Sequence, residues 1–519
     1  MLATTALAVL ALVLLPIVYL VVRASGSGRA WDVLRRERTL ELVLDTAVLV
    51  GAVTTCALAV GVPLAWLVTR TDLPGCRVWA VLAALPLVIP SYVAALALLG
   101  ALGPRGLLQQ ALEAPFGVER LPEIRGFGGA VASLTLSTYP YVFLLAAAAF
   151  RGLDPALEEA SRGFGRSPLA TFLRTTLPAV RPSLAAGSLL VALYTLSDFG
   201  AVSLMRYDAL TRAIYLRYRT LFDRAPAAGL ALLLVAMTLV ILALEVRSRG
   251  RGRYYRGGPG AARRAPPVRL GRWRPAALAF CALVVGAFLV LPVGVLGYWF
   301  ARGISLGRPL GIAWEPVLNS LLVSLLATAA AMLAVLPVAL LPRRRPARWT
   351  RTVEALGYTP NALPGIVVAL SLVFFSARYA SPLYQTLGLL VFAYVVRFFP
   401  QALAGTSSAL QAVSPRLEEA ARGLGRSPRS AFASVTAPLA RPGLLAGAAL
   451  VFLSTMKELP ATLLLRPIEF ETLATEIWRF TSLGLYSRAA PPALLLIAVS
   501  APLVYLLLAR AETAPDPAG

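Results

Sequence analysis

The sequence contains one charged stretch twice, as LEEASRGFGRSP at residues 157–168 and as LEEAARGLGRSP at residues 417–428. Ten of the twelve positions agree, although 417 − 157 = 260 residues separate the two copies. Two glycines interrupt each copy at the same places. A repeat of this quality indicates an internal duplication of a larger unit.

Matching prolines extend the duplication along the chain. Pro86 matches Pro360 and Pro90 matches Pro364, both at an offset of 274 in the numbering (360 − 86 and 364 − 90). Pro178 matches Pro438 at an offset of 260. The difference of 14 residues fits a longer loop in the first half, so the two halves are parallel repeats.

The composition is that of a membrane protein. Of the 519 residues, 58% are hydrophobic and the mean hydropathy is +0.73, whereas soluble proteins have about 45–50% apolar residues. Many apolar runs are long enough to cross a bilayer as helices, and they do not alternate as barrel strands do. Because a bilayer core admits only helices or closed barrels, we predict an all-α polytopic protein in the lipid bilayer.

We expect twelve transmembrane helices, six in each half. The first has no basic segment before it and is longer than a signal-peptide core, so we expect it to be retained. The spans are expected near residues 2–22, 40–69, 78–102, 127–150, 183–205 and 227–246, and near 276–300, 317–341, 352–376, 386–410, 443–465 and 491–510.

The predicted spans divide the chain into five parts and indicate on which side of the membrane each loop lies. The linker is rich in arginine, so the positive-inside rule places it, both termini and both charged stretches in the cytoplasm. Other arginine-rich segments, such as residues 206–224, fall outside in this arrangement. The parts are an N-terminal helix with a periplasmic segment (1–39), a first repeat (40–247) with the charged loop 151–182, a basic linker (248–275), a seventh helix with a periplasmic segment (276–316), and a second repeat (317–510) with the charged loop 411–442.

Several classes of function are excluded by what the sequence lacks. The net charge of +24 lies in short loops between spans, which indicates membrane topology rather than nucleic-acid binding. The absence of histidine excludes His-ligated haem and histidine proton relays. We find no catalytic constellation, no metal or cofactor site and no phosphate-binding GxxxxGK[ST] motif, so we expect no enzyme activity from this chain.

Each charged loop is expected to form a helix, a glycine bend and a second helix. Pro155 begins the first helix and Ser167-Pro168 begins the second, because serine is a good N-cap and proline a good first residue. The loop could be an ordinary one duplicated with its half, but the halves differ far more elsewhere. Two matching protrusions on one face predict a partner with two matching sockets. The residues assigned to this contact are Glu158, Glu159, Ala160, Gly163, Gly165 and Pro178, and Glu418, Glu419, Ala420, Gly423, Gly425 and Pro438.

These loops resemble the EAA loop of permeases in binding-protein-dependent ABC importers, whose pattern is Glu-Ala-Ala, three residues, Gly, nine residues, Ile-x-Leu-Pro. The departures from that pattern are Ser161, Thr175, Val435 and Ala437. The matching residues are Glu159, Ala160, Gly165, Leu177 and Pro178 in the first half and Glu419, Ala420, Ala421, Gly425 and Pro438 in the second.

The resemblance covers essentially the whole chain and implies a type I (MetI-like) permease fold in the bacterial inner membrane. It implies that each loop carries a coupling helix that docks on a cytoplasmic ABC ATPase homodimer, which uses the ATP. The fused halves are similar to the ferric-iron permease subfamily, which receives its cargo from a periplasmic iron-binding protein. The thiamine importer has a similar layout, and an ion-coupled secondary transporter is the alternative class.

Charged residues fall at equivalent depths within the fifth predicted span of the two halves, one in the first half and two in the second. Asp198 matches Glu458 at the offset of 260, and Lys457 precedes Glu458. Such groups are costly in a membrane and usually line a cavity or pair with each other. They either line a cation path or form an interhelical ion pair, or the span ends earlier than drawn.

Two segments expected on the outer side, residues 206–224 and 466–488, mix aromatic residues with arginine and acids. This composition is typical of protein interfaces and also of helices at lipid headgroups. We expect them to contact the periplasmic binding protein.

Overall fold

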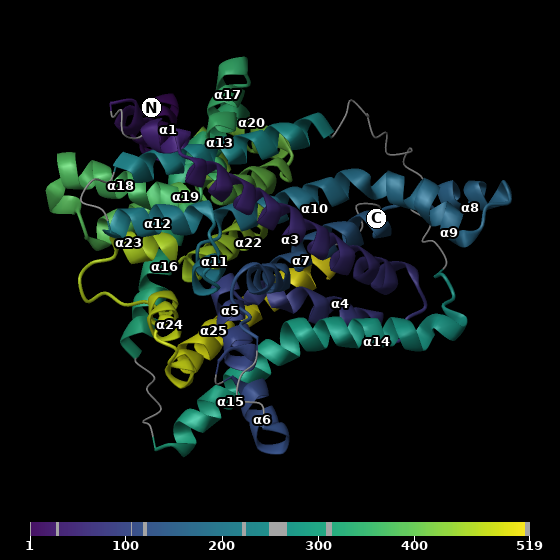
Figure 1. The fold of residues 1–519 in the computed structure, drawn as a ribbon. Helices are drawn as coiled ribbons and strands as arrows, with labels where there is room; N and C mark the ends of the chain where they lie inside the picture. The colour runs from purple at the N-terminus through teal and green to yellow at the C-terminus, as the bar shows by residue number, and fades with distance from the viewer. Residues whose placement is uncertain are drawn as a thin grey trace. The chain divides into compact units, whose positions relative to one another are not determined.

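The structure is a computed structural model that describes residues 2–26, 31–104, 106–117, 122–220, 225–248, 267–307 and 314–513. These residues are almost entirely helical (Figure 1), and one isolated β-bridge among them joins Thr71 to Val268. Within these described ranges, eleven helices are long and apolar enough to cross a membrane, or twelve when a bent pair counts as one span. The expected all-α polytopic fold is confirmed. Most of the predicted basic linker lies outside the described residues, which resume at 267.

The chain forms two compact units, and each unit contains helices from both halves of the sequence. Unit 2 comprises Arg36–Ala213, Ala236–Gly311 and Ile477–Gly519. Within it, Trp299 donates to the carbonyl of Gly100 at 3.1 Å, which fixes a helix of the second half to the first repeat. Its helices are α3 (Glu37–Arg70), α4 (Cys76–Ala84), α5 (Ser91–Leu102), α6 (Leu107–Phe116), α7 (Phe127–Arg151), α8 (Pro155–Gly163), α9 (Pro168–Thr171), α10 (Leu177–Ser197), α11 (Gly200–Leu204), α14 (Arg274–Val285), α15 (Leu291–Ser305) and α25 (Tyr486–Thr513).

Unit 1 comprises Met1–Arg35, Ile214–Val235 and Ile312–Glu476. The first span packs here on the second repeat, because Ser371 donates to the carbonyl of Pro16 at 2.6 Å. The helices of this unit are α1 (Leu2–Ser25), α16 (Trp314–Arg344), α17 (Arg348–Leu356), α18 (Gly365–Tyr379), α19 (Leu387–Gln411), α20 (Pro415–Gly423), α21 (Pro428–Ala431), α22 (Ala437–Met456) and α23 (Pro460–Leu465). Three helices continue from one unit into the other: α12 (Leu210–Thr220), α13 (Ala225–Ser248) and α24 (Leu473–Ser482).

The third span of each half is interrupted, so its prediction as one continuous helix was wrong. Proline restricts the preceding residue to extended backbone, and Ile89 and Leu363 have ψ of 111° and 116° before Pro90 and Pro364. In the second half the helices on either side of this break are bent by 98°. The prolines that reveal the duplication are therefore also the cause of the break.

The fifth span of each half also ends earlier than expected. The helix predicted at 183–205 ends at Ser197, and the one predicted at 443–465 ends at Met456. A short helix, α11 or α23, follows each break. Asp198 and Glu458 therefore lie at helix breaks and not inside continuous spans.

The residues that follow α3 are bound to the end of the linker. The backbone N–H of Val268 donates to the carbonyl of Arg70 at 2.8 Å. The Asp72 carboxylate accepts from the N–H of Leu270 at 2.9 Å and from Arg274 at 2.7 Å. These donors, the Leu270 N–H first, lower the pKa of Asp72. The stabilisation is therefore present above about pH 4 and is lost as the pH falls through the lowered pKa.

Glycines bring α19 and α22 into close contact in unit 1. A Cβ atom at Gly405 would lie 2.9 Å from the Cα of Gly447. Small residues at such crossings let helix backbones approach each other, which drives helix packing in membranes.

We predict that Gly405→Ala destabilises the protein by about 1–3 kcal/mol, because overpacking forces the two helices apart. The thermal midpoint of the purified full chain in detergent measures this. Gly297→Ala is the matched control, since no atom outside its own helix lies within 4 Å of a Cβ placed there. An equal midpoint for both variants would contradict the prediction.

Candidate coupling site

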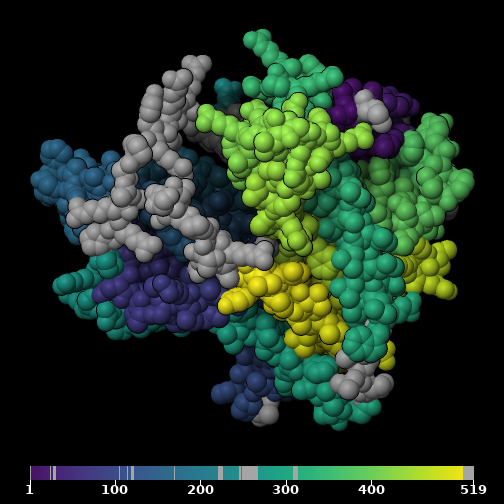
Figure 2. Space-filling view, turned by 180° about the vertical axis from the view of Figure 1, so that it is seen from behind, coloured from purple at the N-terminus to yellow at the C-terminus, as the bar shows by residue number. Residues whose placement is uncertain are grey.

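The two charged loops fold as the sequence predicts. In the first loop, Asp154 caps α8 by accepting from the N–H of Ala156 at 2.9 Å, and Ser167 accepts from the N–H of Ala170 at 3.3 Å. In the second, Ser427 accepts from the N–H of Ser430, also at 3.3 Å. Figure 1 shows α8 and α9 at one end of unit 2, and Figure 2 shows the lime-green segment around residue 420 at the surface of unit 1. Each loop is thus a protruding helix, bend and helix.

The bend requires glycine at one position in each loop. Gly165 and Gly425 have φ of +75° and +86°, a left-handed conformation that costs other residues about 1–2 kcal/mol. Gly163 and Gly423 are exposed ends of α8 and α20 without that requirement. Of the four predicted glycines, one in each loop therefore fixes the turn.

Pro178 and Pro438 lie just beyond a π-helical turn, at Phe172–Thr176 and Phe432–Thr436. A proline inside a helix clashes with the carbonyl four residues earlier, and a π-turn widens the helix there. The same arrangement precedes Pro292, after the π-turn Gly286–Val290. The π-turn thus accommodates the proline of the EAA pattern, so that the helix runs from the loop into the fifth span without a break.

The first glutamate of each pair is bound inside the protein. Glu158 accepts from Arg70 at 2.5 Å and from Thr176 at 2.7 Å, and the side chains of Arg70 and Glu158 are only 6% and 11% exposed. Arg70 is the last residue of α3. The loop is therefore fixed to the end of the second span and to the start of the fifth-span helix.

The second loop has an equivalent anchor, in which the glutamate pairs with two arginines instead of one. Glu418 pairs with Arg344 at 2.6 Å and with Arg343 at 3.9 Å, and it accepts from Thr436 at 2.9 Å. Arg343 also donates to the carbonyl of Leu410. Both arginines lie in the last turn of α16.

These anchor partners were not predicted from the sequence, although the two offsets of the duplication relate them. Arg70 matches Arg344 at the offset of 274, and Thr176 matches Thr436 at the offset of 260. A short apolar run followed by arginine is common at the ends of membrane spans, so a single copy carries little signal. The anchor can be recognised because the arginine and the threonine recur at the same offsets in both halves and both contact a buried glutamate.

Several other loop residues are exposed, whereas Ser161 and Ala421 are buried. Glu159 and Glu419 are exposed, as are Ala160 and Ala420. Between the glycines, Phe164 and Leu424 are 84% and 86% exposed at equivalent positions. Each loop therefore presents an apolar tip, and four exposed arginines flank the two tips: Arg162, Arg166, Arg422 and Arg426.

The two acidic residues at the fifth-span breaks accept hydrogen bonds from backbone N–H groups in the first turn of the short helices. The Asp198 carboxylate accepts from the N–H groups of Ala201 at 2.9 Å and Val202 at 3.3 Å, and from the hydroxyl of Ser91. Glu458 accepts from the N–H of Ala461 at 3.3 Å. Asp198 belongs to unit 2, whereas Lys457 and Glu458 belong to unit 1.

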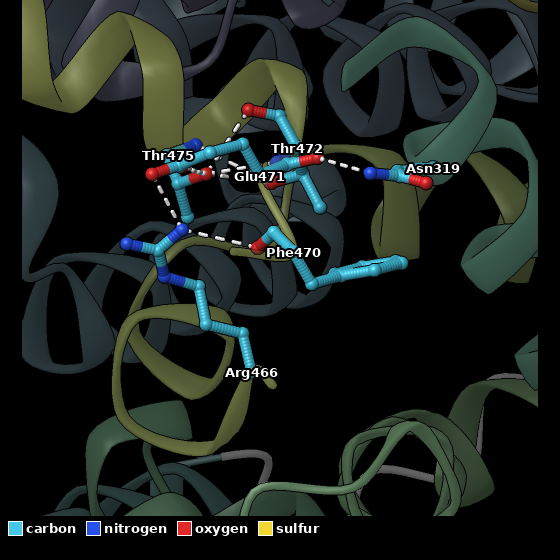
Figure 3. A network of polar contacts seen from close by, with 6 residues as sticks. All are labelled: Asn319, Arg466, Phe470, Glu471, Thr472 and Thr475. Atoms are coloured by element: carbon cyan, nitrogen blue, oxygen red, sulfur yellow. Dashed lines mark hydrogen bonds and ion pairs between the residues drawn. The ribbon is translucent and has the colours of Figure 1, made fainter. Parts of the chain in front are cut away.

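On the predicted outer side, a polar network holds the segment between α23 and α24 (Figure 3). Glu471 pairs with Arg466 at 2.6 Å and accepts from Thr475 at 2.6 Å, and its carbonyl accepts from Asn319 of α16 at 3.0 Å. Ile468 is 79% exposed at the tip of this segment.

Both repeats join their second span to this outer region in the same way. Ser320 accepts from the N–H of Leu473 at 2.8 Å, and Thr46 accepts from the N–H of Leu210 at 3.1 Å. Thr46 and Ser320 match at the offset of 274. Among the residues that the structure describes, no three His, Cys, Asp or Glu side chains gather into a group that could hold a metal ion.

A profile of the family described as binding-protein-dependent transport system inner membrane component matches residues 46–248 and 324–511. The chain belongs to this family. The permease is 33% identical over 498 residues to the Fe(3+)-transport system permease protein FbpB 2 of Haemophilus influenzae, with 95% of each chain covered. It is 26% identical to the ferric transport system permease protein FbpB of Actinobacillus pleuropneumoniae over 73% of this chain and 58% of that protein. It is 30% identical to the molybdenum transport system permease protein ModB of Escherichia coli over 36% of this chain and 82% of that protein.

Membership confirms the resemblance found in the sequence and the duplicated permease fold. The permease is a multi-pass inner-membrane protein and a non-catalytic subunit. Its family implies two kinds of partner, an ATPase and a binding protein.

We predict that Glu158→Gln destabilises the protein by about 3–5 kcal/mol, because it leaves the buried Arg70 charge without its counter-ion. The neighbouring exposed Glu159→Gln is the matched control and should change stability by less than about 0.5 kcal/mol. Thermal unfolding of the purified permease measures both. Equal changes in stability for the two substitutions would show that the Arg70–Glu158 ion pair does not stabilise the fold.

Proposed function

We propose that the permease imports ferric iron delivered by a periplasmic iron-binding protein, and that two coupling loops transmit the work of a separate ATPase homodimer. The observation that carries the proposal is the pair of anchored loops with exposed, equivalent tips. A force on either loop reaches the second and fifth spans through the buried ion pair and the π-turn. A partner with two equal sockets fits two equal tips.

The inward and outward glutamates have different parts in this proposal. Glu158 and Glu418 hold the loops in place, together with the bends at Gly165 and Gly425 and the prolines Pro178 and Pro438. The outward contact is assigned to Glu159, Ala160, Gly163 and Phe164, and to Glu419, Ala420, Gly423 and Leu424. Arginines around the apolar tips favour a socket with an apolar floor and an acidic rim.

We predict that Phe164→Asp combined with Leu424→Asp abolishes ATP-dependent uptake, because a carboxylate cannot enter an apolar socket without a large desolvation cost. Gly165→Leu combined with Gly425→Leu should also abolish uptake, since leucine disfavours the left-handed turn. Proteoliposomes with the permease, its ATPase and its binding protein provide the assay. Phe164→Leu, which copies the residue of the second loop, should retain most of the uptake.

Unchanged uptake by the double aspartate variant would show that Phe164 and Leu424 do not contact the ATPase. Uptake that needs no ATPase and follows an ion gradient would favour the ion-coupled secondary transporter instead.

The iron assignment is supported by the relative from Haemophilus influenzae, which matches over nearly the full length of both chains. The molybdenum permease matches over a shorter part, and thiamine is the alternative cargo of the same importer class. Uptake of radiolabelled iron, with thiamine and molybdate as competitors, distinguishes these cargoes. Inhibition by either competitor at equal concentration would overturn the iron assignment.

We also propose that the charges at the fifth-span breaks face the path of the cargo. Irregular backbone at membrane depth is tolerated only inside protein or along a water-filled cavity. Asp198, Lys457 and Glu458 all lie at such irregular positions. The outer segment around Ile468 is assigned to the contact with the binding protein.

We predict that Asp198→Asn lowers uptake at least tenfold while leaving the thermal midpoint unchanged. The amide oxygen of asparagine can still accept from the N–H groups of Ala201 and Val202, so the helix cap is kept while the charge is lost. Radiolabelled uptake and thermal unfolding of the same preparation measure the two effects. Uptake at the level of the unmodified protein would exclude this charge from the path.

A further inference from the structure

The two fifth-span breaks use different residues at equivalent contacts. In the first half, Ser91, the first residue of α5, donates to Asp198. At the offset of 274, Ser91 matches Gly365, the first residue of α18, and at the offset of 260 Asp198 matches Glu458. One half therefore combines serine with aspartate, and the other combines glycine with glutamate.

The geometry shows why these residues change together. A Cβ atom at Gly365 would lie 2.6 Å from the Oε1 atom of Glu458 and 3.2 Å from Pro460. The longer carboxylate thus occupies the space that the serine side chain fills in the other half. Gly365 is the first residue of its helix and has no positive φ, so a larger residue there would disturb the contact with Glu458 and not the backbone conformation.

Both versions make similar connections, although their threonine partners are not at equivalent positions in the sequence. Each carboxylate caps the short helix that follows the break, α11 or α23, and that short helix packs on α5 or α18. The backbone carbonyl of each acidic residue accepts from a threonine hydroxyl at 2.6 Å, Thr211 for Asp198 and Thr462 for Glu458. In the second half Arg397 of α19 also attracts Glu458 electrostatically.

A second exchange of this kind occurs in the coupling loops. Ser161 and Thr175 depart from the EAA pattern, and their hydroxyl groups lie 3.1 Å apart. At the offset of 260 the equivalent residues are Ala421 and Val435, which are both apolar. Residues in contact have thus changed as pairs in two separate places.

We infer that Ser91–Asp198 and Gly365–Glu458 are two interchangeable forms of one joint, which positions the start of the third-span helix against the short helix after the fifth-span break. The four residues are positioning residues. The joint works only when its two members match, so each pair can replace the other but a single exchange cannot. The inference does not depend on the identity of the cargo or on a role for the charge, because every exchanged form keeps one carboxylate.

The test is a double-mutant cycle in the second half of the full chain. Gly365→Ser alone brings the serine side chain into the Glu458 carboxylate, and Glu458→Asp alone leaves a gap and a shorter reach. We expect each single variant to lower uptake per folded permease at least fivefold. We expect Gly365→Ser with Glu458→Asp to regain at least half of the original uptake, because it recreates the pair of the first half.

The thermal midpoint of each purified variant, measured without partners or cargo, separates loss of folding from loss of transport. If Gly365→Ser does not fold, Glu458→Asp and its rescue by Gly365→Ser decide the question. The reciprocal cycle in the first half, Ser91→Gly with Asp198→Glu, should give the same pattern. A double variant no better than the worse single variant, or single variants that transport as well as the original protein, would overturn the inference.

Discussion

Two ion pairs that hold buried glutamates, Arg70 with Glu158 and Arg344 with Glu418, are the constraint on which the site depends. A polar loop outside the membrane transmits a displacement only if it is fixed to the spans at more than one point. Each glutamate is held by an arginine at the end of one span and by a threonine at the start of another helix. Breaking such a pair leaves a buried charge, which costs far more than losing a surface contact.

Adjacent glutamates therefore have different roles despite their identical chemistry. On a helix, neighbouring residues point about 100° apart, so one carboxylate turns toward the protein and the next toward solvent. The inward residue fixes the loop, and the outward residue is available to a partner. The exposed Phe164 and Leu424 lie beyond the same helices, at the bends that glycine permits.

The two halves of the chain make equivalent contacts even where the residues that make them differ. The anchor uses one arginine in the first half and two in the second, and the joint at the fifth-span break uses serine with aspartate or glycine with glutamate. Each unit also takes helices from both halves, as α1 packs with the second repeat and α25 with the first. The two compact units therefore do not coincide with the two halves of the sequence, because helices of one half complete the core of the other.

The sequence by itself determined the all-helical membrane fold, the duplication and the coupling loops. Apolar runs, proline offsets and the glycine-punctuated stretch are local signals with direct physical causes, so one chain suffices to read them. It could not determine that Glu158 and not Glu159 is buried, that Arg70 and Arg344 are the anchors, or that Ser91 meets Asp198 at the fifth-span break. These depend on which side chains meet across 88 residues in one case and 107 in another. Only the tertiary structure decides such contacts, because the packing of distant helices selects one partner from many similar arginines and serines.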